Sequence, residues 1–165
     1  TWFDQMTDPV SGRTGYTERG GFSSRRAGDH AVHFPREKGE CMTAVSLLCR
    51  FFLGHDPETD KLMGTQADLI LRKPAVWNEK DGSIDHYYWY YATIAMFQVG
   101  GERWKTWNVR MRDTLEERQR RGAPAVDGSW DPVGAWCGQG GRVYSTAMGA
   151  LCLEVYYRYL PLYGD

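Results

Sequence analysis

The chain of 165 residues carries 20 basic and 21 acidic side chains, and this balance argues against nucleic acid as its main partner, because phosphate binding needs a clear basic excess. The length suits one domain, so residues 1–165 are expected to form a single repeat domain. The start at Thr1 predicts that the chain is a fragment of a longer protein. No apolar run reaches the roughly 18 residues of a membrane span, since Glu154 and Arg158 interrupt the best candidate. Nothing in this composition indicates a cellular compartment.

The N-terminal part of the chain predicts little regular structure. Residues 7–40 hold clusters of glycine and charged side chains without a helical or strand period. We therefore expect a long irregular loop region ahead of the first long helix.

Three segments repeat one apolar pattern, and each of them begins with a threonine: Thr43, Thr93 and Thr146. Their spacings of 50 and 53 residues indicate a structural repeat. Around these segments the sequence predicts three helices that are apolar on nearly every side, over residues 41–53, 86–99 and 142–160. Such helices must be covered on every side.

Two amphipathic helices alternate with the apolar ones, over residues 57–72 and 102–121. Asp56 and Pro57 predict the start of the first, as its cap and its first helical residue. The second carries an apolar stripe at helical spacing, made of Trp104, Trp107, Met111 and Leu115. An amphipathic helix covers a neighbour with one face only, so it belongs in an outer layer.

Glycine-rich turns separate these helices. The sequence DGSID at 81–85 precedes the second apolar helix, and DGSWD at 127–131 precedes the third. Glycine allows a sharp reversal of the backbone there, and an aspartate can cap the helix that follows. Residues 132–141 are expected to be a flexible connector, with Cys137 outside any helix. The predicted fold is all-α, with apolar helices inside and amphipathic helices outside.

A glutamine near the end of an outer helix, followed by Gly-x-Trp, resembles the repeat of the squalene-cyclase and protein prenyltransferase superfamily. Gln119 and Gly128-Ser129-Trp130 carry the pattern, and Gln66 with Gly82-Ser83-Ile84 is a second copy in which isoleucine replaces tryptophan. The resemblance implies an α/α toroid of about six hairpins. Residues 1–165 would then be a single α/α-toroid repeat domain that supplies about three of them, roughly half a ring.

The resemblance also implies catalytic chemistry that two aspartates could carry. Asp85 and Asp131 end the two acidic turns, so either is a candidate general acid of a terpene cyclase. Together they could instead be the carboxylate pair of a carbohydrate-active α/α-toroid enzyme. The alternative is that both are turn and cap residues.

Zinc is a further implication of the resemblance, since protein prenyltransferases bind it through Asp, Cys and His. Cys41 begins the first apolar helix and His86 begins the second, so these two residues are the alternative metal ligands. Two ligands do not complete a site, and the main expectation is a protein without a cofactor.

Aromatic residues near the starts of the apolar helices are candidates for ligand binding: Tyr88, Trp89, Trp130, Trp136 and Tyr144. Such rings offer an apolar pocket to a lipid-like ligand, or they pack the core.

The sequence therefore predicts a repeat module that binds an apolar, isoprenoid-like ligand or a partner protein at the ends of the apolar helices. It would not be catalytically complete alone. Half of a terpene cyclase or of a zinc prenyltransferase is the first alternative, and a carbohydrate-active enzyme is the second. A half ring would also be expected to self-associate or to contact the rest of its parent protein.

Overall fold

The computed structural model describes residues 1–162, and every regular element in that part of the chain is a helix. The elements are α1 (Trp2–Met6), α2 (Asp29–His33), the short 3-10 helix η1 (Arg36–Lys38), α3 (Cys41–Phe52), α4 (Lys61–Leu71), α5 (His86–Val99), α6 (Gly101–Arg118), α7 (Cys137–Leu153) and α8 (Val155–Arg158). Strand-like pairing among these residues is limited to an isolated bridge between Thr7 and Thr14. The all-α prediction is confirmed.

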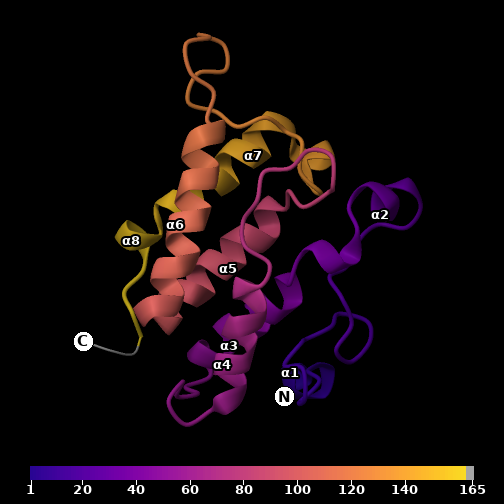
Figure 1. Ribbon diagram of the computed structural model, residues 1–165, viewed down its shortest axis with the longest axis vertical. Helices are drawn as coiled ribbons and strands as arrows, with labels where there is room; N and C mark the ends of the chain where they lie inside the picture. The colour runs from indigo at the N-terminus through magenta and orange to yellow at the C-terminus, as the bar shows by residue number, and fades with distance from the viewer. Residues whose placement is uncertain (163–165) are drawn as a thin grey trace.

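Helix α5 lies at the centre of the molecule (Figure 1). It packs against α3 on one side and α7 on the other, and α6 and α8 also contact it. Its sequence, which has no charged residue after His86, buries side chains around the whole circumference. A helix that is apolar all round is stable only when it is covered in this way. The predicted bounds of this helix, 86–99, are confirmed.

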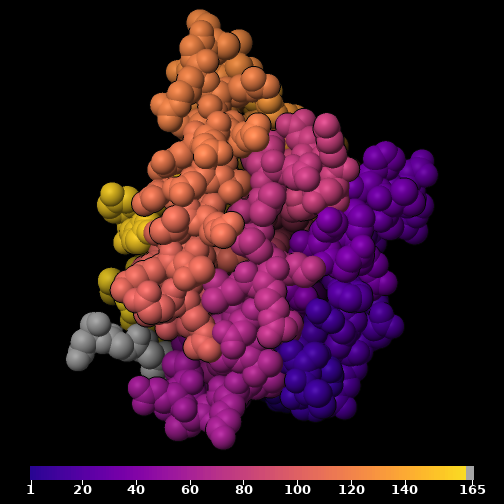
Figure 2. Space-filling view, in the orientation of Figure 1, coloured from indigo at the N-terminus to yellow at the C-terminus, as the bar shows by residue number. Residues whose placement is uncertain are grey.

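The amphipathic helices α4 and α6 pack against α3 and α5 respectively, and they also contact each other. Figure 2 shows both of them on the face toward the viewer. The predicted stripe of α6 faces inward, with Trp107, Met111 and Leu115 buried. The indole Nε1 of Trp107 donates to Oγ1 of Thr93 on α5 at 3.0 Å, which joins the outer helix to the central one.

The start of the first amphipathic helix was wrongly predicted. Helix α4 begins at Lys61, four residues after the expected start, and residues 57–59 form a turn. Asp60 is the cap, because its carboxylate accepts from the amide of Leu62 at 3.1 Å. The same carboxylate contacts Arg50 of α3 and the imidazole Nδ1 of His55, at 3.5 and 2.8 Å. These partners lie before the helix and hold the carboxylate of Asp60 in place, which favours Asp60 over Asp56 as the cap.

The third apolar helix also differs from its prediction. Helix α7 begins at Cys137, inside the expected connector, and Gly141 interrupts it with φ 58° and ψ −149°. Only glycine adopts that conformation readily, so one turn of helix precedes the break. The predicted helix 142–160 is split, since α7 ends at Leu153 and the short α8 follows. Similarly, α6 ends at Arg118 because Gln119 is extended.

Residues 7–40 are largely irregular, as predicted, but they include α2 and η1 and are firmly attached. Arg13 donates from Nε and Nη2 to the buried carboxylate of Glu40, at 2.9 to 3.1 Å. Ser23 donates to the carbonyl of Gly39 and accepts from the amide of Cys41, at 2.9 and 3.2 Å. Side-chain bonds of this kind replace regular structure in holding the segment against the start of α3.

A hairpin-like loop between α6 and α7 projects from one end of the molecule (Figure 1). Two backbone hydrogen bonds of 2.8 Å close the base of this loop. The amide of Arg120 donates to the carbonyl of Ser129, and the amide of Gly128 donates to the carbonyl of Arg120. The amide of Gly122 donates to the carboxylate of Asp127 at 2.7 Å. Residues 121–125 at the tip are exposed.

The Gln–Gly-x-Trp pattern at the base of this loop joins two helices. Gln119 donates from Nε2 to the carbonyl of Gly128 at 2.9 Å, and the indole of Trp130 donates to the carbonyl of Leu115 at 2.8 Å. The ring of Trp130 lies so close to Gly149 of α7 that a Cβ there would be 3.0 Å from a ring carbon. Gln66, in the second copy, instead donates to Thr14 and Ser46.

We predict that Trp130→Ala lowers the free energy of unfolding by about 3–5 kcal/mol, because it leaves a cavity between α6 and α7 and removes the bond to Leu115. Urea denaturation measures this change through the midpoint at an unchanged slope. The control is Trp2→Ala, whose partly exposed ring should cost less than about 1 kcal/mol. Equal losses for the two variants would contradict this role of Trp130.

Candidate functional site

The N-terminal ends of α3, α5 and α7 meet on one side of the molecule. The imidazole Nδ1 of His86, the first residue of α5, lies 3.8 Å from Sγ of Cys137, the first residue of α7. Just before these helices, the amide of Ala135 donates to the carbonyl of Ile84 at 2.9 Å. The charge of Asp85 also acts on Cys41 at the start of α3. Three helix starts that are far apart in sequence therefore form one region.

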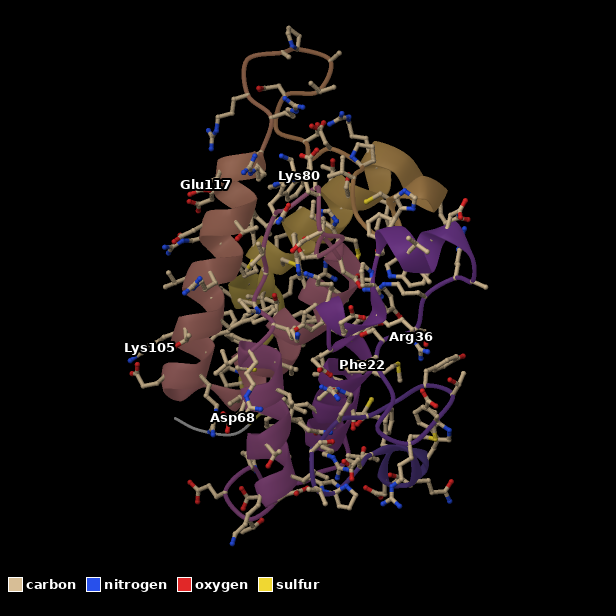
Figure 3. The ribbon with its side chains drawn as sticks, turned by 45° about the vertical axis from the view of Figure 1, so that its right-hand side comes forward. Phe22, Arg36, Asp68, Lys80, Lys105 and Glu117 are labelled. Atoms are coloured by element: carbon tan, nitrogen blue, oxygen red, sulfur yellow. The ribbon has the colours of Figure 1, made fainter. Side chains whose placement is uncertain are left out.

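The N-terminal segment covers this region. Phe22 and Arg36, labelled in Figure 3, lie on the same segment, and Arg36 donates to the carbonyls of Ser23 and Phe22 at 3.1 and 3.4 Å. The guanidinium of Arg25 reaches inward from the segment. It donates from Nε to the carbonyl of Phe34 and from Nη1 to the carbonyl of Ser24, at 3.1 and 3.0 Å. These bonds fix the direction of its third nitrogen.

Arg25 and Asp85 form a buried ion pair, with Nη2 2.9 Å from Oδ2 and both side chains 1% exposed. The other carboxylate oxygen of Asp85 accepts from the amide of Tyr88 at 3.0 Å and so caps α5. One residue thus satisfies the first turn of the central helix and holds the covering segment. Taking such a pair from water is costly, and removing one partner leaves a buried charge without compensation.

Asp131, the second predicted acid, lies in a different setting. Its carboxylate pairs with Arg120, and its other oxygen accepts from Nη2 of Arg142 at 2.6 Å. The hydrogen bonds from Arg120 hold the pKa of Asp131 below its usual value. A general acid needs the opposite shift. The structure does not bring the two aspartates together: Asp85 is bound to Arg25 in the interior, and Asp131 lies at the base of the projecting loop.

Cys41 and His86, the alternative zinc ligands, are both buried and have other neighbours. Burial raises the pKa of Cys41 well above its usual value and lowers the pKa of His86 to about 4. The ring of His86 packs against both Trp77 and Trp89, with ring centroids 5.5 and 5.1 Å away. Among residues 1–162, no group of three or more His, Cys, Asp or Glu side chains is arranged to hold a metal ion.

Three of the five predicted ligand-binding rings belong to the core. Tyr88, Trp89 and Trp130 are buried, and the hydroxyl of Tyr88 donates to the carbonyl of Lys73 at 2.8 Å. A ligand could not reach these rings without opening the fold. Trp136 and Tyr144 are partly exposed, and Trp136 lines a cavity at the surface.

That cavity has a volume of about 230 Å³ and opens beside the starts of α3 and α5. Most of its walls are aromatic or sulfur-containing side chains, namely Tyr16, Cys41, Met42, Tyr87 and Trp136, and Ser24 and Arg25 complete the lining. Sequence reasoning missed Tyr16 and Arg25, because residues 7–40 show no periodicity that would place them. Met42 and Tyr87 share a signal that could have found them, since each is the second residue of a predicted apolar helix.

Trp136 also lines a second cavity of about 270 Å³, together with His30, Phe34 and Gly134. The ring of His30 lies 5.3 Å from that of Trp136. Nε2 of His30 is 2.5 Å from the carbonyl of Ala135, and Nδ1 accepts from the amide of Arg26 at 3.2 Å. Because Nδ1 accepts, Nε2 carries the proton and donates. His30 thus supports the indole that separates the two cavities.

A larger cavity of about 530 Å³ lies elsewhere, between the turn before α4 and the junction of α5 and α6. Arg103 lines it and donates to Asp68 of α4, which is labelled in Figure 3, at 2.8 Å. Its lining contains none of the residues that the sequence predicts to be catalytic, ligand-binding or metal-ligating. Volume alone therefore does not identify the site, and the cavity at the helix starts has the aromatic walls.

Comparison with protein-family models, with curated proteins and with solved structures found no match for this chain. Within residues 1–162, no helix combines the length and the apolar character needed to cross a bilayer.

We predict that Asp85→Asn lowers the free energy of unfolding by about 3–5 kcal/mol, because asparagine keeps the cap but leaves the buried charge of Arg25 without a partner. Asp131→Asn is the matched control, and its partly exposed carboxylate should contribute about 1 kcal/mol or less. Urea denaturation of both variants measures the difference. A larger loss for Asp131→Asn would show that the ion pair of Asp85 is not the stronger constraint.

His86 makes stability depend on pH. Its folded-state pKa of about 4 is below the ordinary value of 6.5, so the unfolded chain takes up a proton first as the pH falls. The contribution of the neutral ring is present above about pH 6.5 and is lost toward pH 4, where the loss approaches about 3 kcal/mol. Urea denaturation across this range should show a smaller loss for His86→Phe. The variant His33→Phe, which changes an exposed ring, should keep the wild-type dependence.

Proposed function

We propose that this chain is a repeat module of the α/α-toroid type, and that it binds a small apolar, isoprenoid-like ligand in the cavity at the starts of α3 and α5. Support for the toroid comes from the alternation of α3, α5 and α7 with the amphipathic α4 and α6. The contacts of Gln119 and Trp130 with Gly128 and Leu115 also support it, because they join the end of α6 to the loop that leads to α7, at the residues that carry the family resemblance.

The composition of the cavity walls is the observation on which the proposed ligand depends. Tyr16, Tyr87 and Trp136 supply rings, and Met42 and Cys41 supply sulfur-containing side chains. Arg25 is the charged residue of the lining, and Asp85 neutralises it from within the protein. An apolar ligand loses little on entering such a site, whereas a strongly charged one would lose its hydration without a free counter-charge.

The settings of the acidic residues favour binding over proton transfer. One oxygen of Asp85 accepts from the amide of Tyr88 and the other pairs with Arg25, so neither is poised to deliver a proton to a ligand. Asp131 is engaged by Arg120 and Arg142 at the surface. A cyclase or a glycosidase needs at least one carboxyl group that can exchange protons with its substrate.

The size of the cavity limits the part of the ligand that is enclosed. At about 30 Å³ for each non-hydrogen atom, the share of a water molecule in the liquid, a volume of 230 Å³ holds about eight such atoms. One five-carbon unit or one six-membered ring fits. A longer ligand would extend from the opening past Tyr16 and Tyr87, both of which are partly exposed.

Titration with 2-methyl-2-butene and with toluene, followed by proton–nitrogen correlation NMR, tests the proposal. Binding should shift the backbone amides of Met42 and Tyr87 and the indole signal of Trp136. Tyr87→Ala should weaken binding about tenfold through the loss of one wall, equivalent to about 1.4 kcal/mol. Tyr157→Ala, which removes a tyrosine that is 90% exposed, should have no effect. If neither hydrocarbon shifts the signals of the cavity residues, the proposal is overturned.

A further inference from the structure

The starts of α5 and α7 hold an unusual number of polar atoms without hydrogen bonds. Among residues 1–162, eight buried side-chain nitrogen or oxygen atoms have no such partner, and five of them belong to this region: Arg25 Nη2, Asp85 Oδ2, His86 Nε2, Trp89 Nε1 and Tyr144 Oη. Buried polar groups in folded proteins are normally paired. A concentration of unpaired groups beside a cavity therefore indicates a missing polar partner.

Arg25, which is paired with Asp85, is the member of this set that lines the ligand cavity. Nη2 and Oδ2 attract each other across 2.9 Å, but their orientation does not make a hydrogen bond. Every other nitrogen of the guanidinium is already bonded, to Phe34 or to Ser24. The remaining capacity of the pair is thus a donor on Arg25 and an acceptor on Asp85, side by side.

We infer that the ligand carries a neutral hydroxyl group, which binds to the Arg25–Asp85 pair while its apolar body lies against Met42 and Tyr87. The hydroxyl oxygen accepts from Nη2 of Arg25, and the hydroxyl proton is donated to Oδ2 of Asp85. This inference rests on the proposed function, because it assigns the polar end of the ligand that the cavity is proposed to bind.

The charge balance of the pair selects a neutral group. A carboxylate would be attracted by Arg25 but repelled by Asp85. An ammonium group would be attracted by Asp85 but repelled by Arg25. A hydroxyl both donates and accepts, so it satisfies both atoms at once. A hydrocarbon of the same shape leaves both unsatisfied, so it should bind more weakly than the alcohol.

Trp136 lies beside the buried pair. Cζ of Arg25 lies 6.0 Å from the centre of the Trp136 ring, and Nη2 and Oδ2 are closed to solvent. The indole lines two cavities, of about 230 and 270 Å³. The inference therefore requires the side chains around the pair, Trp136 among them, to move when the ligand binds.

Four ligands with one ring test the inference: benzyl alcohol, toluene, benzylamine and benzoate. Their dissociation constants are measured near neutral pH by proton–nitrogen correlation NMR. Benzyl alcohol should bind at least about tenfold more tightly than toluene, the equivalent of one good hydrogen bond to a charged group. It should also bind more tightly than the amine and the carboxylate.

The outcomes separate this inference from the proposed function. If toluene binds and benzyl alcohol is less than about threefold tighter, the polar end is filled by water alone and the inference is wrong, while the proposed function stands. Tighter binding of benzoate or benzylamine would also overturn the inference, by assigning a charged group. If none of the four shifts the cavity signals, both proposals fail.

A spectroscopic measurement on the unmodified protein locates the bond. The side-chain Nε–H signal of Arg25 should shift with benzyl alcohol and remain in place with toluene. Arg25→Lys keeps the charge but removes the planar donor, so the preference for the alcohol should fall to about twofold or less. The control is Arg110→Lys, on the exposed face of α6, which should keep the full preference. An unchanged preference in a folded Arg25→Lys variant would contradict the inference.

Discussion

Asp85 carries the interaction on which the rest of this structure depends. One of its oxygens accepts the amide of Tyr88 at the start of α5, and the other faces the guanidinium of Arg25. The first contact caps the central helix, because it satisfies the amide of Tyr88 in the first turn. The second joins that helix to a segment sixty residues earlier, which is also attached by side-chain bonds such as that of Ser23 with Cys41. Because α5 contacts α3, α6 and α7, the carboxylate that fixes the start of α5 also affects how these three helices are placed.

A buried ion pair of this kind contributes more to specificity than to stability. Two apolar side chains of similar volume would often be as stable, because both charges must lose their hydration. The guanidinium is held by the carbonyls of Ser24 and Phe34, so its pairing with Asp85 sets how this segment lies against the start of α5. It also leaves polar bonding capacity next to an aromatic cavity. The same interaction therefore orders the N-terminal segment and prepares the polar end of the proposed ligand site.

The sequence predicted the parts of this fold that depend on periodicity. The bounds of α5 and the inward stripe of Trp107, Met111 and Leu115 follow from the spacing of apolar residues. The errors concern features that depend on distant partners. Asp56 and Asp60 are equally good caps in isolation, and Arg50 and His55 decide between them. Asp85 and Asp131 end nearly identical turns, yet Arg25 makes one a buried anchor and Arg120 keeps the other at the surface. Of the predicted ligand-binding rings, Trp136 alone lines the cavity at the starts of α3 and α5. Tyr88, Trp89 and Trp130 are buried in the core instead.

The projecting loop after α6 offers a practical opportunity. Its neck is closed by the paired backbone groups of Arg120, Gly128 and Ser129, so its tip is mechanically separate from the helices. Residues 122–125 are exposed, and the nearest helix ends are anchored by Gln119 and Trp130 rather than by the tip. A peptide epitope or a fluorescent label inserted there should leave the helical layers undisturbed, which makes this loop a handle for following the protein without touching its cavity.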